Sequence, residues 1–363
     1  MKMSFRWYGT SDTIPLTYIK QIPSMRGIVS AIYDIPVGEV WPEARIQALK
    51  KEIEEAGLEL TVIESVPVHE DIKLGLPTRD QYIASFQQTL KNLSENGITT
   101  VCYNFMPVFD WTRSSLEHRL EDDSTCLSYD NSVIELMDPV KGNLSLPGWD
   151  TSYEKEELAQ LFEQYRSVGT EELWGNLSYF LEQVIPVAEQ VGINLAMHPD
   201  DPPWSIFGLP RIITNEQNIE RLLSLYESPN HGLCFCTGSL GALDTNDLPQ
   251  MVRKFGSQGR IHFVHARNVK RTSEKSFHET AHPSEYGSVD MYEVLKALHD
   301  VSYSGPIRPD HGRMIWGETG KPGYGLFDRA LGATYLTGLW EAIQKDQQSV
   351  NGGKIHDVAA VRK

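Results

Sequence analysis

The stretch Ser304-Gly305-Pro306-Ile307-Arg308-Pro309-Asp310-His311-Gly312 is a short extended run that ends in an ionisable pair. Prolines on both sides of Arg308 exclude helical geometry and favour an extended backbone. Asp310 and His311 therefore lie where a strand ends and the chain turns. A carboxylate beside an imidazole suits a metal ligand next to a proton-transfer group, although a lone Asp-His pair is more often part of a solvated loop. The rest of the chain favours the first interpretation.

Seven similar apolar runs precede this stretch, and amphipathic helical patterns separate most of them. Residues 42–57 show such a pattern, because Pro42 suits the start of a helix and Gly57 suits its end. Strands that alternate with helices predict an α/β protein, a (β/α)₈ TIM barrel, rather than an open sheet. The predicted strands are 5–9, 27–32, 58–63, 98–104, 193–198, 231–236, 260–265 and the opening stretch.

The predicted barrel accounts for nearly the whole chain, since 363 residues fit one barrel with insertions. The pattern breaks over a long polar stretch after Asn104. A long connection inside a compact domain is usually functional or disordered, so we expect long loops at the C-terminal mouth of the barrel. We therefore expect a single catalytic domain at residues 1–345 and a polar C-terminal tail at residues 346–363.

Composition and charge exclude several classes of protein. The net charge of -16 argues against nucleic-acid and anionic-membrane partners, because phosphate binding needs a basic surface. No apolar run approaches the roughly 18 residues of a membrane span, and residues 1–7 lack the apolar core of a signal peptide. Four cysteines in so long a chain do not form a disulfide framework. We therefore expect a cytoplasmic protein whose partner is a small molecule.

Four residues with metal-binding side chains close four consecutive predicted strands. Because the strand ends of a barrel converge on one mouth, residues far apart in sequence become neighbours there. Two imidazoles, a thiolate and a carboxylate suit a divalent transition metal. The alternative is that each is an ordinary strand-end residue, but four coincidences in register favour a metal site. The predicted ligands are His198, Cys236, His265 and Asp310.

Other cysteine and histidine residues fit this site less well. Cys234 shares a strand face with Cys236 because the two are separated by one residue, but Cys236 is nearer the mouth. We therefore predict that Cys236 is the ligand and that Cys234 packs in the core. His262 has the opposite parity to His265 and is expected to face the surrounding helices.

Several stretches of the chain resemble the mannonate dehydratase family of the hexuronate pathway. The resemblance runs from the first predicted strand to the closing helix, and the run Asn104–Arg113 (NFMPVFDWTR) is its most specific part. Gly323-Tyr324-Gly325, followed by Arg329 and Gly332, resembles the C-terminal signature of that family. The other matching stretches are 5–9 (FRWYG), 102–103 (CY), 197–203 (MHPDDPP), 234–239 (CFCTGS) and 308–312 (RPDHG).

The resemblance implies a hydro-lyase that dehydrates D-mannonate to 2-keto-3-deoxy-D-gluconate in glucuronate catabolism, with Mn²⁺ or Fe²⁺ as cofactor. It also implies a xylose-isomerase-like barrel, and the family's metal ligands fall on the four residues that the strand spacing selects. The proposed acid/base residues of the family fall on His311 and Tyr324. We further expect a homo-oligomer.

The required chemistry agrees with these assignments. Loss of water from a sugar acid needs removal of a weakly acidic proton beside a carboxylate and protonation of a poor leaving hydroxyl. A divalent ion offsets the developing charge, and His and Tyr side chains suit the two proton transfers. Strict alternation directs His311 away from the metal, but Gly312 permits a turn that returns the imidazole to the substrate. For Tyr324, packing or capping is the alternative role.

Four residues are candidate substrate binders. Asn104, Arg113 and Arg308 carry groups that bind hydroxyls or carboxylates, with helix-surface or ion-pair roles as alternatives. Tyr8 belongs to a set of aromatic residues near the predicted loops, together with Trp7, Trp111 and Trp316. These aromatic residues form either an apolar wall of the site or ordinary packing.

Three other functions compete with dehydration. A sugar isomerase or epimerase uses the same barrel and a metal, but usually with carboxylate-rich sites and often with two metals. A metal-dependent nuclease is disfavoured by the acidic composition. A non-catalytic sugar-binding or metal-binding protein is distinguished only by an assay for turnover.

Overall fold

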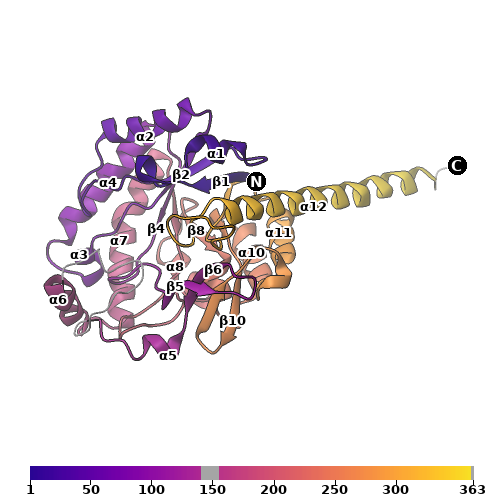
Figure 1. Cartoon of the computed structure of the whole chain (residues 1–363). Helices are drawn as coiled ribbons and strands as arrows, with labels where there is room; N and C mark the ends of the chain where they lie inside the picture. Colours follow the sequence, from indigo (N-terminus) through magenta and orange to yellow (C-terminus); the bar gives the residue numbers. More distant parts are fainter. Residues whose placement is uncertain (140–154, 361–363) are drawn as a thin grey trace.

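The computed structural model describes residues 1–139 and 155–360 (Figure 1). Within them, eight parallel strands close into a barrel in the order β1-β12-β9-β8-β7-β4-β3-β2. Each overlaps one of the eight predicted strands, so the predicted TIM barrel is confirmed. The strands are β1 (Lys2–Arg6), β2 (Gly27–Ser30), β3 (Glu59–Glu64), β4 (Thr100–Tyr103), β7 (Asn194–Met197), β8 (His231–Cys236), β9 (Ile261–Ala266) and β12 (Pro306–Pro309).

Helices surround the barrel (Figure 1). The predicted helix after β2 is present as α2, whose buried face consists of Ile46, Leu49 and Ile53 at helical spacing. The longer helices are α2 (Glu43–Glu55), α4 (Arg79–Glu95), α6 (Lys155–Tyr165), α7 (Thr170–Val191), α8 (Glu216–Leu225), α10 (Leu248–Ser257), α11 (Met291–Asp300) and α12 (Phe327–Ala360). The shorter ones are α1 (Leu16–Gln21), α3 (Glu70–Leu74), α5 (Asn131–Ile134), α9 (Thr237–Gly241), η1 (Gly9–Ser11) and η2 (Ser284–Tyr286).

The barrel interior is a packed core. Six barrel strands each contribute one fully buried side chain to a separate apolar cluster. Cys234 is 0% exposed within this cluster, in agreement with its predicted place in the core. Small and medium side chains fill the space below the mouth, as in other barrels of this size. The members are Val29, Val62, Cys102, Ala196, Cys234 and Phe263.

A second sheet covers part of the barrel mouth. It has four antiparallel strands in the order β10-β11-β6-β5, built from the segments that follow β4 and β9. Its strands are β5 (Ser115–Arg119), β6 (Thr125–Tyr129), β10 (Val269–Ser273) and β11 (Ser276–Glu279). Phe277 pairs with Tyr129 where the two hairpins meet, and their rings stack at 5.9 Å. We call this element the lid sheet. The sequence predicts long loops here but no strands.

The last helix extends beyond the barrel. The α12 helix begins at Phe327, and its far end projects away from the strands and the other helices (Figure 1). Residues 346–360, which belong to the predicted polar tail, are part of this helix. The domain boundary at residue 345 stays a prediction. No helix in the described ranges is both long and apolar enough to cross a membrane.

Candidate active site

A cavity of about 1040 Å³ opens at the carboxyl ends of the barrel strands. Parallel barrel strands direct these ends to one mouth, so residues at or just after the strand ends line the cavity. Loop residues complete the wall, among them Trp111, Lys321 and Tyr324. The residues at the strand ends are Arg6, Glu64, Asn104, His198, His265 and Asp310.

The two predicted histidine ligands turn one ring nitrogen each toward the same point. Nε2 of His198 lies 3.2 Å from Nδ1 of His265. Their other nitrogens are engaged, since Nδ1 of His198 donates to the Pro199 carbonyl at 2.6 Å and Nε2 of His265 donates to Glu64 at 3.2 Å. These oxygens only accept, so the protons lie on the outer nitrogens. The lone pairs therefore lie on the facing nitrogens, as metal ligation requires.

Cys236 and Asp310 complete the set of predicted ligands. The ligand atoms of His198, Cys236 and His265 all lie within 4.8 Å of one another. Oδ2 of Asp310 lies 3.7 Å from Nδ1 of His265 and 3.9 Å from Sγ of Cys236. A tetrahedral ion with bonds of about 2.0–2.3 Å needs ligand atoms about 3.3–3.8 Å apart. His198, Cys236 and His265 therefore lie close enough together to hold one metal ion, and Asp310 lies beside two of them.

The surroundings of Cys236 favour the thiolate that metal binding needs. Burial raises the pKa of this thiol, but the Arg267 guanidinium and the two imidazoles lower it further, and the pKa lies well below its usual value. The backbone N–H and the hydroxyl of Ser239 donate to Sγ at 3.4 and 3.1 Å. A thiolate in this position is a strong ligand for a transition metal.

Glu64 links the candidate metal centre to two arginines. Its carboxylate accepts from His265 and forms ion pairs with Arg308 at 2.9 Å and Arg6 at 3.3 Å. Nη2 of Arg308 also lies 2.7 Å from Oδ1 of Asp310. Glu64 was not among the predicted site residues, although it directly follows the third predicted strand. The four ligands were selected as metal-binding side chains at the ends of predicted strands, and Glu64 meets the same criterion.

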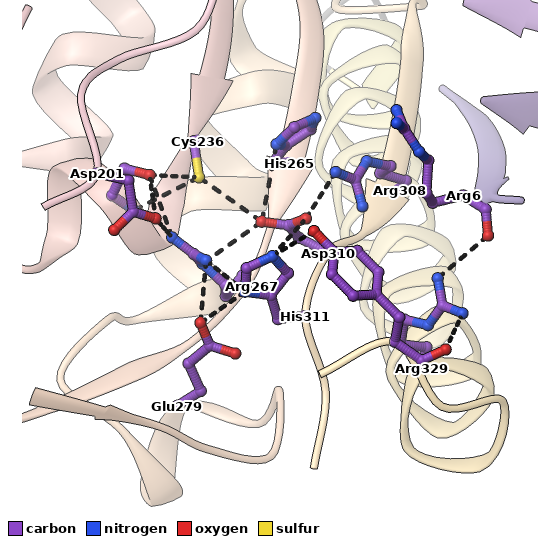
Figure 2. Close-up of polar contacts among 12 residues, drawn as sticks. Arg6, Asp201, Cys236, His265, Arg267, Glu279, Arg308, Asp310, His311 and Arg329 are labelled. Atoms are coloured by element: carbon purple, nitrogen blue, oxygen red, sulfur yellow. Dashed lines mark hydrogen bonds and ion pairs between the residues drawn. The ribbon is translucent and has the colours of Figure 1, made fainter. Parts of the chain in front are cut away.

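His311 and Tyr324, the predicted acid/base residues, are in direct contact. Nε2 of His311 lies 2.7 Å from the hydroxyl of Tyr324. Figure 2 shows His311 beside Asp310, with Glu279 on its other side. The turn that the sequence suggested is present, since the Gly312 N–H donates to the Gly323 carbonyl at 2.8 Å. That hydrogen bond closes the loop between β12 and α12 and brings Tyr324 back to the imidazole.

A glycine is required at the return of this loop. Gly323 has φ +79°, a conformation that side chains with a Cβ rarely adopt. A Cβ there would lie 2.6 Å from Cδ1 of Leu127 on β6 of the lid sheet. The Gly-Tyr-Gly motif therefore sets the approach of Tyr324 to the lid sheet and to His311.

Arg113, a predicted substrate binder, lies behind the cavity wall instead of lining it. Its side chain is 0% exposed and forms ion pairs with Asp201 at 2.7 Å and Glu279 at 2.8 Å. Arg267 contacts the same two carboxylates, at 2.5 and 3.1 Å. These contacts correspond to the ion-pair alternative that the sequence left open for Arg113. Two arginines and two carboxylates thus form a buried, charge-balanced network.

The other predicted substrate binders line the cavity. Tyr8 packs edge-on against Tyr324 at 5.1 Å, and Nζ of Lys321 lies 3.9 Å above its ring. The aromatic residues divide between the two roles that the sequence left open. Trp111 lines the cavity, whereas Trp7 is buried in the core and Trp316 is 74% exposed. Asn104 and Arg308 line the wall near the metal ligands.

Sequence reasoning missed several charged residues of the site. Arg6 ends the first strand, and Arg267 follows His265 by two residues, so both lie close to recognised positions. Lys321 lies in the loop before Tyr324, where no local pattern marks it. Glu279 lies in a hairpin whose pairing depends on a distant segment of the chain, and no signal in its neighbourhood indicates its contact with His311.

The fold of the chain is that of the xylose-isomerase-like TIM barrels. The solved structure of L-ribulose 3-epimerase has a TM-score of 0.55 at 13% identity, with 96% of this chain and 97% of that chain covered. The Xylose isomerase domain protein from Planctomyces limnophilus has a TM-score of 0.54 at 14% identity, with coverage of 95% and 98%. These likenesses concern the fold alone.

Within that class, the chain belongs to the mannonate dehydratase family. Residues 1–350 match the family model for D-mannonate dehydratase (UxuA). "Mannonate dehydratase 2" of Halalkalibacterium halodurans is 64% identical over 343 residues, covering 94% of this chain and 99% of the relative. The mannonate dehydratase of Oceanobacillus iheyensis is 59% identical over 351 residues, with coverage of 97% and 100%. The crystal structure of mannonate dehydratase from Streptococcus suis serotype 2 has a TM-score of 0.90 at 50% identity, with 96% of both chains covered.

Proposed function

We propose that this hydro-lyase converts D-mannonate to 2-keto-3-deoxy-D-gluconate, using Mn²⁺ or Fe²⁺ held by His198, Cys236, His265 and Asp310. Membership of the family defines the reaction class. The observation that supports the metal assignment most strongly is the pair of facing nitrogens of His198 and His265, 3.2 Å apart, with both outer nitrogens already hydrogen bonded. When bound, the ion offsets the negative charge that develops as the proton leaves the carbon beside the carboxylate.

The protein moves two protons in this reaction. The proton on carbon 2 must be removed, and the hydroxyl on carbon 3 must be protonated to leave as water. The resulting enol then takes up a proton at carbon 3 and loses the proton of its carbon 2 hydroxyl, which gives the 2-keto group. His311 and Tyr324 suit these transfers because their reactive atoms lie 2.7 Å apart. Burial raises the pKa of Tyr324 well above its usual value, so its hydroxyl keeps its proton in the resting site and donates a hydrogen bond to Nε2 of His311.

The cationic side of the cavity suits a sugar acid. Nε of Arg6 and Nη1 of Arg308 are buried and have no hydrogen-bond partner within the described ranges. Unpaired buried donors are unfavourable, so a bound anion or hydroxyl that accepts from them stabilises the complex. Lys321 adds a third cation at the cavity wall. We assign Arg6, Arg308 and Lys321 to the carboxylate and its neighbouring hydroxyls, with Tyr8 and Asn104 as the adjacent wall.

The test is the product formed by the metal-loaded enzyme. D-mannonate should give a 2-keto acid without an added redox cofactor. The same enzyme should leave aldoses and ketoses unchanged under the same conditions. Inert D-mannonate together with isomerised or epimerised ketose would instead favour the sugar isomerase or epimerase alternative on the same barrel.

Further proposals concern the context of the enzyme. We propose a cytoplasmic enzyme of sugar-acid catabolism, with one catalytic domain at residues 1–345 and a separate C-terminal segment at 346–363. We also propose a homo-oligomer, supported by an exposed apolar group next to the active-site loop. Trp316 and Phe327 are in ring contact at 5.6 Å, and Leu331 follows Phe327 by one helical turn with 47% exposure. Light scattering of the purified protein tests the oligomer.

A further inference from the structure

Glu279 is completely buried on the inner end of the lid sheet. It ends β11, and its side chain is 0% exposed. One oxygen, Oε1, is the acceptor for three groups: Nδ1 of His311 at 2.6 Å, Nη2 of Arg113 at 2.8 Å and Nη1 of Arg267 at 3.1 Å. Figure 2 shows Glu279 below Arg267 and His311, on the side away from Cys236 and His265. The lid sheet therefore reaches the imidazole at the nitrogen opposite Tyr324.

The contact determines which ring nitrogen of His311 carries a proton. A carboxylate oxygen only accepts, so a separation of 2.6 Å from Nδ1 requires a proton on that nitrogen. Nη1 of Arg267 also lies 2.8 Å from Nδ1, but it donates one of its two hydrogens to Oε1, and the shorter contact of Nδ1 is the one to the carboxylate. With Nδ1 protonated, Nε2 of the neutral ring has a lone pair, and the Tyr324 hydroxyl lies in position to donate to it at 2.7 Å.

We infer that Glu279 is a positioning residue for the elimination: it holds His311 in the Nδ1–H tautomer, with Nε2 directed at Tyr324 and the cavity. The inference rests on the proposed proton-transfer role of His311. The logic is that of a buried carboxylate that orients a catalytic imidazole without taking its proton. Glu279 itself does not line the cavity, and it reaches the site through its contacts with His311 and Arg267.

The arginines keep Glu279 in its ionised form. Burial raises the pKa of its carboxyl, but His311, Arg267 and Arg113 lower it further, and the pKa lies below the usual value. The carboxylate is consequently a poor base toward Nδ1–H and a strong hydrogen-bond acceptor. Arg113 comes from the loop after β4 and Arg267 from the end of β9, so the orientation of His311 depends on the lid sheet being docked on both segments.

A double-mutant cycle tests whether Glu279 acts through His311. Glu279→Gln retains the shape of the side chain but loses the charge, so the tautomer is no longer fixed. We expect kcat to fall by about tenfold to 10²-fold with KM changed by less than about twofold, because ground-state binding does not involve Glu279. In the His311→Asn background, the same substitution should change the remaining rate by less than about twofold.

Asp201→Asn is the matched control for this cycle. Asp201 shares both arginines with Glu279 but is not in contact with His311 among the contacts of the described residues. Its substitution should change kcat by the same factor with and without His311. A Glu279→Gln variant that also lowers kcat by the same factor in both backgrounds would overturn the inference, since its effect would then be structural.

Two further outcomes separate the inference from the function on which it rests. If His311→Asn alone keeps near-normal turnover, the proposed role of His311 fails, and the inference fails with it. If His311→Asn is impaired but the cycle is additive, only the role of Glu279 is wrong. Should Glu279→Gln fail to fold, Glu279→Asp retains the charge, and its loss of kcat should likewise disappear in the His311→Asn background.

Discussion

The facing nitrogens of His198 and His265 lie 3.2 Å apart, and both rings are fixed by a hydrogen bond at the opposite nitrogen. With the outer nitrogens protonated, each facing nitrogen presents a lone pair to the other, so this contact needs a positive charge between the rings. Beside them lie the acidified thiol of Cys236 and the carboxylate of Asp310. A divalent ion held among these groups would satisfy the facing lone pairs and the negative charges.

The carboxylate behind His265 should control metal affinity. Glu64→Gln removes the charge that the Nε2–H of His265 donates to, and the ring becomes a weaker and less oriented ligand. We expect metal affinity to fall by about 10-fold to 100-fold. Glu59→Gln, at the exposed start of the same strand, should leave the affinity unchanged. Metal titration of the two variants measures this difference, and equal affinities would contradict the assigned role of Glu64.

The two cysteines of β8 should respond differently to the same substitution. Cys236→Ser replaces a thiolate with a poor ligand and should remove most of the bound metal. Cys234→Ser should retain the metal and lose about 1–3 kcal/mol of unfolding free energy, because it places a hydroxyl in an apolar cluster. Metal analysis with thermal unfolding distinguishes the two. Metal loss confined to Cys234→Ser would reverse the assignment.

Asp310 and His311, which are adjacent at the end of β12, should differ in function: Asp310 binds the metal and His311 transfers a proton. Asp310→Asn removes an anionic ligand and should lower both metal content and turnover. His311→Asn should keep the metal while turnover falls by about 10²-fold or more, because an amide does not transfer protons at neutral pH. Tyr324→Phe should behave like His311→Asn. Loss of metal from His311→Asn would identify His311 as a ligand.

Lys321 should give substrate binding a pH dependence. Burial, and then the charge of Arg6, lower the pKa of this lysine to about 8. Its ammonium is therefore charged below about pH 8 and becomes neutral as the pH rises through that value. The KM for D-mannonate should rise above pH 8 in the wild-type enzyme. In Lys321→Arg the side chain stays charged, and this rise in KM should disappear. A rise that persists in Lys321→Arg would assign it to another group.

The barrel and the candidate ligands were predictable because both depend on local pattern and topology. Apolar runs ended by polar residues predicted eight strands. The convergence of strand ends at one mouth predicted the meeting of His198, Cys236 and His265, with Asp310 beside the last two. Neither step required knowledge of distances. The same rule applied to residue 64 would have added Glu64 to the prediction.

The lid sheet and the residues it carries were not predictable in this way. Its strands are short, and β11 pairs with β6 from a distant part of the chain. Such pairing leaves little trace in either segment alone. Glu279 therefore had no recognisable context, and Arg113 was a reasonable candidate for substrate binding until its two carboxylate partners, one in the lid sheet, were known. The position of a charged side chain depends on partners that local sequence does not specify.

The central claim is that this chain dehydrates D-mannonate with a divalent ion held by His198, Cys236, His265 and Asp310. The most direct measurement follows metal content and 2-keto acid formation in the same samples, before chelation, after chelation, and after adding back Mn²⁺ or Fe²⁺. We predict that turnover falls with the metal, returns with it in the wild-type enzyme, and does not return in Cys236→Ser. Turnover of D-mannonate that survives complete removal of the metal would contradict the account.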